Sequence, residues 1–285
     1  MIIGKRGFKL ENRELLREMI CALSDNGMEN AGFEANQLLE LSGIPRMKVI
    51  TDPSGAVSER AVDNARAYLE RRLSGEPLQY ILGEWEFYGL PFKVGKGVLI
   101  PRQDTELLVD IAKEFLSNFP EGESVLDLCA GSGCIGISLA KYCNAEAVLV
   151  EKSPEAFEYL RRNIALNGVE EKCGAVLGDC FDEYGEFSAI VSNPPYLTIS
   201  DMKNLQREVR FEPELALYGG DDGLDYYRRM LKVHAKNLKK NGLFAVEIGI
   251  GEERAVMEIF RENGLEPSCE KDLNGIYRVV YAIKN

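Results

Sequence analysis

The sequence predicts an α/β protein in which a largely parallel β-sheet follows a small helical domain. Apolar residues recur with helical spacing before residue 75, and after Pro101 short apolar runs alternate with amphipathic helices. A chain of 285 residues accommodates one α/β domain of roughly 150–200 residues and a smaller neighbour. We therefore expect two domains.

The N-terminal part is expected to be a helical bundle, because two apolar stripes between residues 11 and 73 have helical spacing. The aromatic and β-branched stretch LQYILGEWEFYGLPFKV follows, with a break at Tyr88-Gly89, and it predicts a β-hairpin. The expected boundaries are 1–75 for the helical domain, 76–97 for a hairpin linker and 98–285 for the α/β domain.

The α/β domain is expected to begin with a helix at about 104–119. Strands are predicted at 124–129, 146–151, 174–179, 187–193, 242–249 and 277–283, with helices near 134–143, 154–167, 223–240 and 252–263. Right-handed crossovers place helices on both faces of such a sheet and ligands at the carboxyl ends of its strands.

The overall charge argues against a nucleic-acid partner. The formal net charge is -12, which repels a polyphosphate backbone unless basic residues gather on one face, and the longest basic clusters are only pairs. The seven cysteines form no C-x-x-C pair and His234 is the single histidine, so we expect free thiols and no metal site. The start turns charged before an apolar leader develops, and no stretch is long enough to span a membrane, which predicts a cytoplasmic protein.

A glycine-rich loop follows the first predicted strand of the sheet. Gly131, Gly133 and Gly136 satisfy G-x-G-x-x-G, which allows a ligand to approach the backbone at a helix N-terminus. The glycines alone also fit a nicotinamide-dependent dehydrogenase. Asp127, at the end of the preceding strand, would repel a pyrophosphate but suits the cationic amino-acid end of S-adenosylmethionine.

Acidic residues end the first three predicted strands. Glu151 is placed to accept both ribose hydroxyls and Asp179 to reach the adenine amino group. Each acid taken alone is equally consistent with a helix N-cap or a solvated loop residue. The three acids together with the loop favour S-adenosylmethionine binding.

The loop after the fourth predicted strand reads Ser192-Asn193-Pro194-Pro195-Tyr196. Two prolines fix φ and remove two donors, so neighbouring carbonyls stay free, Asn193 adds an amide oxygen, and Tyr196 can stack on a flat group. Such a loop can hold both hydrogens of a planar NH₂ group and aim its nitrogen at a methyl carbon. A Pro-Pro strand terminator is the alternative for an isolated motif of this kind.

These residues resemble the release factor glutamine methyltransferases, the PrmC/HemK family of class I methyltransferases. The resemblance also covers EPLQYILGEWEFYGLPFKV (76–94), VLIPRQDTELLV (98–109) and FEPELALYGGDDGLDYYRRM (211–230). It implies a Rossmann-like, mostly parallel seven-stranded sheet and methylation of the glutamine amide in the Gly-Gly-Gln motif of class I peptide-chain release factors, with S-adenosylhomocysteine as product. We expect a monomer whose N-terminal helices recognise the release factor.

The resemblance also implies the site residues. Asn193, Pro194 and Tyr196 are the catalytic set, and with Pro195 they bind the glutamine. Segment 101–106 is expected to close over the site with Arg102 paired to Glu106, or else to be a helix N-terminus capped by Asp104 or Thr105. Segment 211–225 is expected to be a substrate-facing flap or a mobile loop. The cofactor contacts that the resemblance implies are Cys129, Ala130, Gly131, Ser132, Gly133, Glu151, Cys180 and Asn193. Asp127 and Asp179 are expected as further contacts because of their places at strand ends.

Two other functions compete with this one. A DNA or RNA amino-methyltransferase could use the same loop on a base amine, but it needs a basic recognition surface. A non-catalytic adaptor with this fold should show a damaged site, whereas the acidic strand ends and the Asn-Pro-Pro-Tyr motif are intact.

Overall fold

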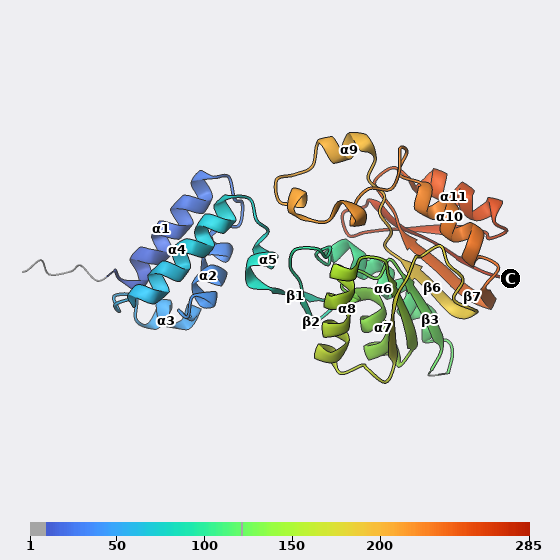
Figure 1. Ribbon diagram of the computed structural model, residues 1–285, viewed down its shortest axis with the longest axis horizontal. Helices are drawn as coiled ribbons and strands as arrows, with labels where there is room; N and C mark the ends of the chain where they lie inside the picture. The colour runs from blue at the N-terminus through green and yellow to red at the C-terminus, as the bar shows by residue number, and fades with distance from the viewer. Residues whose placement is uncertain (1–9, 121) are drawn as a thin grey trace, which may run out of the picture. The chain divides into compact units, whose positions relative to one another are not determined.

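The computed structural model describes residues 10–120 and 122–285, so most of the start expected to lack a leader lies outside the described residues. The chain forms two compact units that meet in sequence between Gly83 and Glu84, whereas the sequence predicted a first boundary after residue 75 (Figure 1). Over the described ranges, no helix has both the length and the apolar character needed to cross a membrane.

The first unit is helical. Its core is apolar and includes Leu15, Met19 and Leu38, all essentially inaccessible to solvent. Arg72 forms an ion pair with Glu34 at 2.7 Å, which joins the second and fourth helices. The helices are α1 (Asn12–Asp25), α2 (Ala31–Leu41), α3 (Arg46–Thr51), α4 (Glu59–Leu73) and α5 (Leu78–Leu82).

Helix α5 occupies part of the segment predicted to be a hairpin. Leu78 and Ile81 lie three residues apart and are buried in the helical core, so tertiary packing selects a helix for this apolar run. Gly83 ends the helix at φ 76°. The hairpin is shorter than expected and consists of β1 (Glu84–Phe87) and β2 (Leu90–Lys93), which belong to the second unit.

The second unit contains a seven-stranded sheet with the order β5-β4-β3-β6-β7-β9-β8. The first five strands in this order are parallel, and β9 runs antiparallel to both of its neighbours, β7 and β8. The mostly parallel seven-stranded sheet predicted from the sequence is therefore confirmed. The strands are β3 (Ser124–Leu128), β4 (Glu146–Glu151), β5 (Cys173–Leu177), β6 (Phe187–Ser192), β7 (Leu238–Glu247), β8 (Pro267–Lys271) and β9 (Tyr277–Ile283).

Helices cover both faces of this sheet (Figure 1). One apolar layer is shared with α6 (Glu106–Leu116), α7 (Cys134–Cys143) and α8 (Pro154–Asn167), and the other with α10 (Asp225–His234) and α11 (Glu253–Glu262). Hairpin residues Phe87, Leu90 and Phe92 pack into the first layer. Short helices η1 (Gln103–Thr105), α9 (Ile199–Lys203), η2 (Val209–Phe211) and η3 (Glu214–Ala216) lie in the loops.

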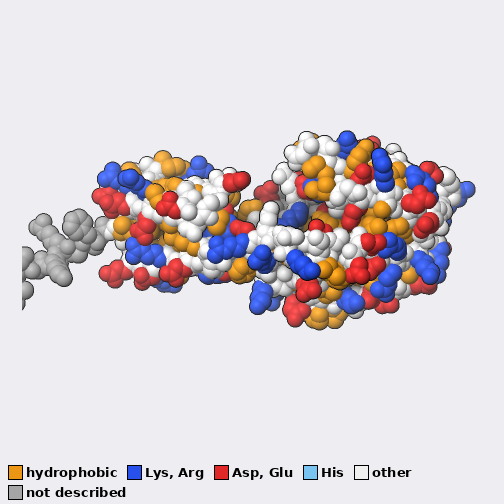
Figure 2. All heavy atoms as spheres, turned by 90° about the horizontal axis from the view of Figure 1, so that it is seen from above, with side chains coloured by type: hydrophobic (Ala, Val, Ile, Leu, Met, Phe, Trp, Pro, Cys, Tyr) orange, Lys and Arg blue, Asp and Glu red, His pale blue; other side chains and the backbone are white. Residues whose placement is uncertain are grey.

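Charged side chains of both signs are interspersed on the face shown in Figure 2, over the first unit and over the second. The carboxyl ends of β3, β4, β5, β6 and β7 meet at one edge of the sheet, because these strands are parallel. The loops that follow them contain the residues of the site.

Candidate active site

The glycine turn connects β3 to the N-terminus of α7. Gly133 is the N-cap residue of α7 at φ 83°, and a Cβ there would lie 2.4 Å from Leu160 Cδ1. Cys129 is also in the left-handed region, at φ 60°, although it carries a side chain. A left-handed backbone costs a non-glycine residue about 1–2 kcal/mol. Cys129 therefore adds local strain to the turn.

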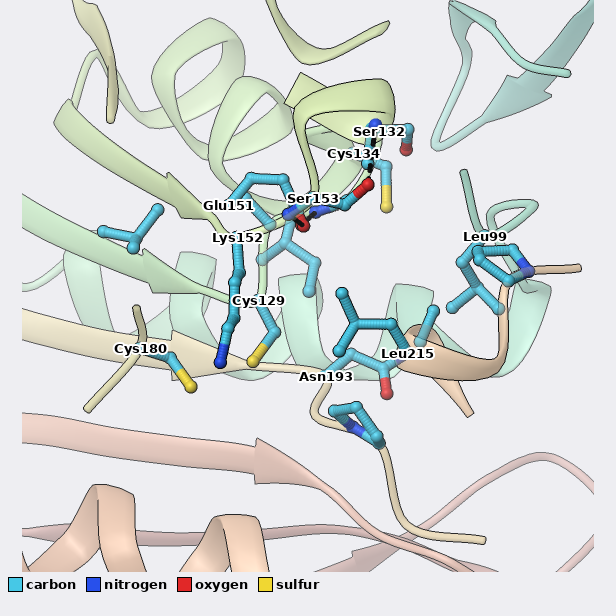
Figure 3. A pocket seen from close by; sticks show the side chains of 18 of the residues that line it. Leu99, Cys129, Ser132, Cys134, Glu151, Lys152, Ser153, Cys180, Asn193 and Leu215 are labelled. Atoms are coloured by element: carbon cyan, nitrogen blue, oxygen red, sulfur yellow. Dashed lines mark hydrogen bonds between the residues drawn. The ribbon is translucent and has the colours of Figure 1, made fainter. Parts of the chain in front are cut away.

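Glu151 fixes the shape of this turn. Its Oε2 accepts a hydrogen bond of 2.8 Å from Gly131 N–H, and its Oε1 accepts one of 2.7 Å from Ser153 N–H. Burial raises the pKa of Glu151, although these backbone donors work in the opposite direction. The carboxylate thus ties together the loops after β3 and β4, as Figure 3 shows.

The first cavity lies at these loops (Figure 3). The neighbouring thiols of Cys129 and Cys180 border it, and their mutual hydrogen bond, together with burial, raises the pKa of Cys129 well above its usual value. A neutral thiol makes this part of the wall apolar. Of the residues predicted to contact a cofactor, the cavity is lined by Cys129, Ala130, Gly131, Ser132, Glu151, Cys180 and Asn193.

Three predicted cofactor residues do not line this cavity. Gly133 serves the turn instead. Asp127 is fully buried beneath it, where its Oδ2 accepts a hydrogen bond of 2.9 Å from Gly136 N–H in the first turn of α7. Asp179 pairs with Lys152 at 2.8 Å and accepts from Phe181 N–H. Asp127 thus contacts the first turn of α7 and Asp179 its own loop, and their predicted contacts with the cofactor stay predictions.

Burial dominates the titration of Asp127. Desolvation raises its pKa to about 7, and the hydrogen bond from Gly136 only partly opposes this rise. Its Oδ1 atom has no hydrogen-bond partner. The pKa of Asp179 is lowered, because the hydrogen bonds from Lys152 and Phe181 outweigh the opposing effect of partial burial.

Asn193 lies on the wall between two cavities. A second cavity is lined by Asn193, Pro194 and Tyr196, whereas Pro195 lines the first. The structure therefore brings the Asn-Pro-Pro-Tyr motif to the glycine turn, as the sequence analysis expected. Both cavities share Leu99, Arg102, Asn193 and Ala216.

Segment 101–106 does not contain the expected pair between Arg102 and Glu106. Arg102 pairs with Glu212, whose Oε2 also accepts a hydrogen bond of 3.1 Å from Ile100 N–H. Glu106 instead accepts a hydrogen bond of 2.8 Å from Tyr88 N–H. The short helix η1 displaces Arg102 from the turn that would have faced Glu106, so the pairing expected from the sequence is wrong.

Segment 211–225 contributes to both cavities. Pro213, Leu215 and Ala216 line the first, and Ala216 and Leu217 line the second. Leu197 N–H donates a hydrogen bond of 2.8 Å to the carbonyl of Leu217, which holds the segment beside the motif loop.

Two residues that were not expected in the site contact the motif directly: Thr105, expected at most as a helix cap, and Glu247. Thr105 accepts a hydrogen bond of 3.1 Å from Asn193 Nδ2 and donates one of 2.6 Å to Glu247. Glu247 is an acidic residue at the end of a fourth strand, β7. The search for acids at strand ends that pointed to Glu151 could therefore have found it.

The fold is that of the class I methyltransferases. Solved structures similar to this chain include a methyltransferase from Pyrococcus furiosus, with a TM-score of 0.53 and 18% sequence identity, covering 78% of this chain and 99% of that one. The catalytic domain of hMettl16, solved with an RNA hairpin, has a TM-score of 0.57 and 13% identity, covering 79% and 82%. At these identities the likeness concerns the fold alone.

Sequence comparisons show the family. The TRM5/TYW2 methyltransferase domain matches residues 109–213, and the PrmC N-terminal domain matches residues 14–83. The release factor glutamine methyltransferase of Geobacter sulfurreducens is 40% identical over 90% of this chain and 91% of its own length. That of Thermodesulfovibrio yellowstonii is 39% identical over 85% and 88%. The chain belongs to the release factor glutamine methyltransferase family.

Proposed function

We propose that this chain transfers a methyl group from S-adenosylmethionine to the side-chain amide nitrogen of the glutamine in the Gly-Gly-Gln motif of class I peptide-chain release factors. The observation that carries the proposal is the position of Asn193, which borders the cavity at the glycine turn and the cavity at the motif loop. A residue in that position can orient a nucleophile toward a donor.

The residues of the first cavity fit the methyl donor. A Cβ added to Gly131 would meet no atom within 4 Å, so the turn leaves open space beside its backbone. Glu151 lines the same cavity and provides a carboxylate for ribose hydroxyls, and Ile135 and Tyr226 provide apolar wall. S-adenosylmethionine supplies an electrophilic methyl group carried on a sulfonium.

The motif loop is suited to hold an amide. Thr105 engages the Nδ2 atom of Asn193, which leaves Oδ1 as an acceptor for a substrate N–H. We assign the Pro194 carbonyl as the second acceptor and Tyr196 as the surface on which the amide plane stacks. Both N–H bonds of the substrate amide then point to acceptors, and the lone pair of its nitrogen faces the first cavity.

Positioning can account for most of the chemistry. An amide nitrogen is a poor nucleophile because its lone pair is delocalised, and orientation alone can lower a barrier by about 7–11 kcal/mol. The nitrogen loses a proton only as it becomes cationic, so the site needs no strong base before attack.

We assign recognition of the release factor to the helical unit, whose residues 14–83 match the PrmC N-terminal domain. A glutamine at a loop tip must be presented in one orientation, and a docking area of ordinary size exceeds the rim of a single cavity. A monomer in the cytoplasm, where release factors act, is the simplest form of such an enzyme.

The test is mass spectrometry of a purified release factor after incubation with the protein and S-adenosylmethionine. One added methyl group on the Gly-Gly-Gln glutamine is the expected result, and a factor with that glutamine changed to alanine is the matched control. Methyl transfer to DNA or RNA, with none to the factor, would instead support a nucleic-acid methyltransferase. Failure to bind S-adenosylmethionine in calorimetry would support a non-catalytic adaptor.

A further inference from the structure

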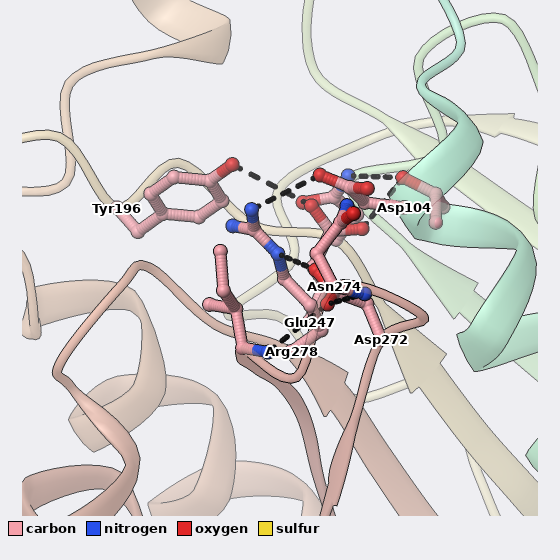
Figure 4. A network of polar contacts seen from close by, with 9 residues as sticks. Asp104, Tyr196, Glu247, Asp272, Asn274 and Arg278 are labelled. Atoms are coloured by element: carbon pink, nitrogen blue, oxygen red, sulfur yellow. Dashed lines mark hydrogen bonds and ion pairs between the residues drawn. The ribbon is translucent and has the colours of Figure 1, made fainter.

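Glu247 is a buried acid that contacts the motif from the sheet. It is the last residue of β7 and is 2% exposed. Its Oε2 accepts a hydrogen bond of 2.6 Å from the Thr105 hydroxyl, and its Oε1 accepts one of 3.5 Å from the Tyr196 hydroxyl. Figure 4 shows Glu247 together with Tyr196. Glu247 therefore contacts the last side chain of the Asn-Pro-Pro-Tyr motif directly and the first through Thr105.

The hydrogen bonds around Glu247 have a fixed direction when its side chain is ionised. A carboxylate only accepts, so Thr105 directs its proton to Glu247 and offers a lone pair to Asn193. Asn193 meets that lone pair with Nδ2, at 3.1 Å. The amide oxygen of Asn193 is thereby turned away from Thr105, toward the space where a substrate N–H must be held.

Further charged residues lie around this series of hydrogen bonds. Arg278, on β9, pairs with Asp104 at 3.1 Å and with Asp272 at 2.9 Å, as Figure 4 shows. Cys134 and Tyr227 are further titratable groups near Glu247, and the Tyr227 hydroxyl lies 3.3 Å from Glu252 Oε2. Arg278 favours the ionised form of Glu247, whereas Asp104 opposes it.

We propose that Glu247 is a positioning residue that acts through Thr105 to fix the amide orientation of Asn193, and through its contact with Tyr196 to hold the motif loop. This inference rests on the proposed function. Protonation of Glu247 would allow the hydroxyl of Thr105 to point back to Asn193, so the amide could flip and lose the substrate acceptor.

The Glu247 carboxyl is expected to titrate near neutral pH. Burial raises the pKa of Glu247 to about 7, against the opposing hydrogen bond from Thr105. Methyl transfer should therefore rise with pH through this region, because the ionised form sets the productive orientation. If Glu247 only packed against its neighbours, its ionisation would not cause this rise in activity with pH.

The test compares Glu247→Gln with wild type in steady-state assays on the intact release factor. Glutamine keeps the shape but can donate to Thr105, so we expect kcat to fall by at least about 10-fold while cofactor affinity stays within about 2-fold. The rising limb near pH 7 should disappear from the variant's pH profile. Glu258→Gln, on the exposed face of α11, is the matched control.

Thr105 provides a second pair of variants that does not alter the buried acid. Thr105→Ser keeps the hydroxyl and should restore kcat to within about 3-fold, whereas Thr105→Val keeps the shape and should lower kcat by at least about 10-fold. If Glu247→Gln does not fold, the comparison of Thr105→Ser with Thr105→Val tests the proposal by itself. Equal kcat in Thr105→Ser and Thr105→Val would overturn the proposal.

A readout that needs no substrate separates this inference from the proposed function. The side-chain NH₂ protons of Asn193, observed by NMR after ¹⁵N-asparagine labelling, should be protected from exchange in wild type and in Thr105→Ser, but not in Thr105→Val. If wild type methylates no release factor, the proposed function fails while this protection pattern still supports the chain of hydrogen bonds. An unprotected wild-type amide would overturn it.

Discussion

Arg102 and Glu212 form an ion pair although they are 110 residues apart in sequence. The Glu212 side chain is 1% exposed and that of Arg102 is 37% exposed. The pair joins the segment before α6 to the segment after η2, and both segments border the two cavities. One contact thus holds two parts of the rim together.

Arg102→Ala should destabilise the second unit and weaken binding of both ligands. Glu212 would remain buried with only the Ile100 N–H as partner, which costs about 3 kcal/mol. Urea unfolding followed by fluorescence of Trp85, the single tryptophan, reports on this unit because Trp85 lies in β1. In the double variant Arg102→Ala/Glu212→Ala the cost should be smaller than the sum of the single costs.

The matched control is Arg261→Ala. Arg261 pairs with Glu258 on the surface of α11, and loss of such an exposed pair changes stability by no more than about 0.5 kcal/mol. An equal loss of stability in Arg102→Ala and Arg261→Ala would show that the buried pair does not hold the rim.

Asn193→Ala should separate turnover from cofactor binding. The change removes the acceptor proposed to orient the glutamine amide, so kcat should fall by about 10²–10³. Calorimetry should give a dissociation constant for S-adenosylmethionine within about 3-fold of wild type. Asn118→Ala, at an exposed position after α6, is the control. Retained turnover in Asn193→Ala would remove this residue from the mechanism.

Asp127→Asn should flatten the pH dependence of stability. Below about pH 4 the Asp127 carboxyl is protonated in the folded and unfolded states and contributes no slope. Between this region and its folded pKa of about 7, the unfolded chain releases a proton that the folded protein keeps. Stability therefore falls as pH rises, by up to about 1.4 kcal/mol per pH unit.

The measurement is the free energy of unfolding of the two proteins at pH 5 and pH 8, again from Trp85 fluorescence. Asparagine still accepts from Gly136 N–H but cannot ionise, so the decline should be smaller in the variant. Glu247 and Glu252, whose pKa values burial raises to about 7, keep part of the slope. Exposed Asp182→Asn is the control, and an unchanged decline in Asp127→Asn would contradict the prediction.

A chain that begins at Glu84 should bind S-adenosylmethionine normally and methylate the intact release factor poorly. The second unit keeps its hairpin and core in this truncation, whereas the surface assigned to recognition is lost. We expect kcat/KM to fall by at least about 100-fold. A chain beginning at Gly97 should fail to fold, because it lacks the buried Phe87 and Phe92. Full activity from Glu84 onward would place recognition in the second unit.

Much of the fold could be predicted because strong local patterns coincide with burial. The strands at 146–151 and 277–283 lie where the sequence predicted them. Strand β8 was missed because only Pro267 is buried among its residues, so no apolar alternation marks it. Helix α10 ends at His234, earlier than predicted, because β7 begins at Leu238.

The positions of candidate site residues were predictable at the ends of strands, since Glu151 is the last residue of β4 and Asn193 directly follows β6. The partners of Glu247 could not be predicted, because Thr105 is 142 residues away in sequence and Tyr196 is 51 away. The hydrogen bond that Asp127 accepts could not be predicted either, because its donor, the N–H of Gly136, lies outside the strand of Asp127, in α7.

The wall that Asn193 shares between the two cavities has a thermodynamic consequence. Leu99, Arg102, Asn193 and Ala216 face both ligand spaces, so any rearrangement that one ligand imposes on them changes the surface presented to the other. If the bound methyl donor moves these residues, it changes the affinity for the protein substrate, and by linkage the protein substrate changes the affinity for the donor by the same factor.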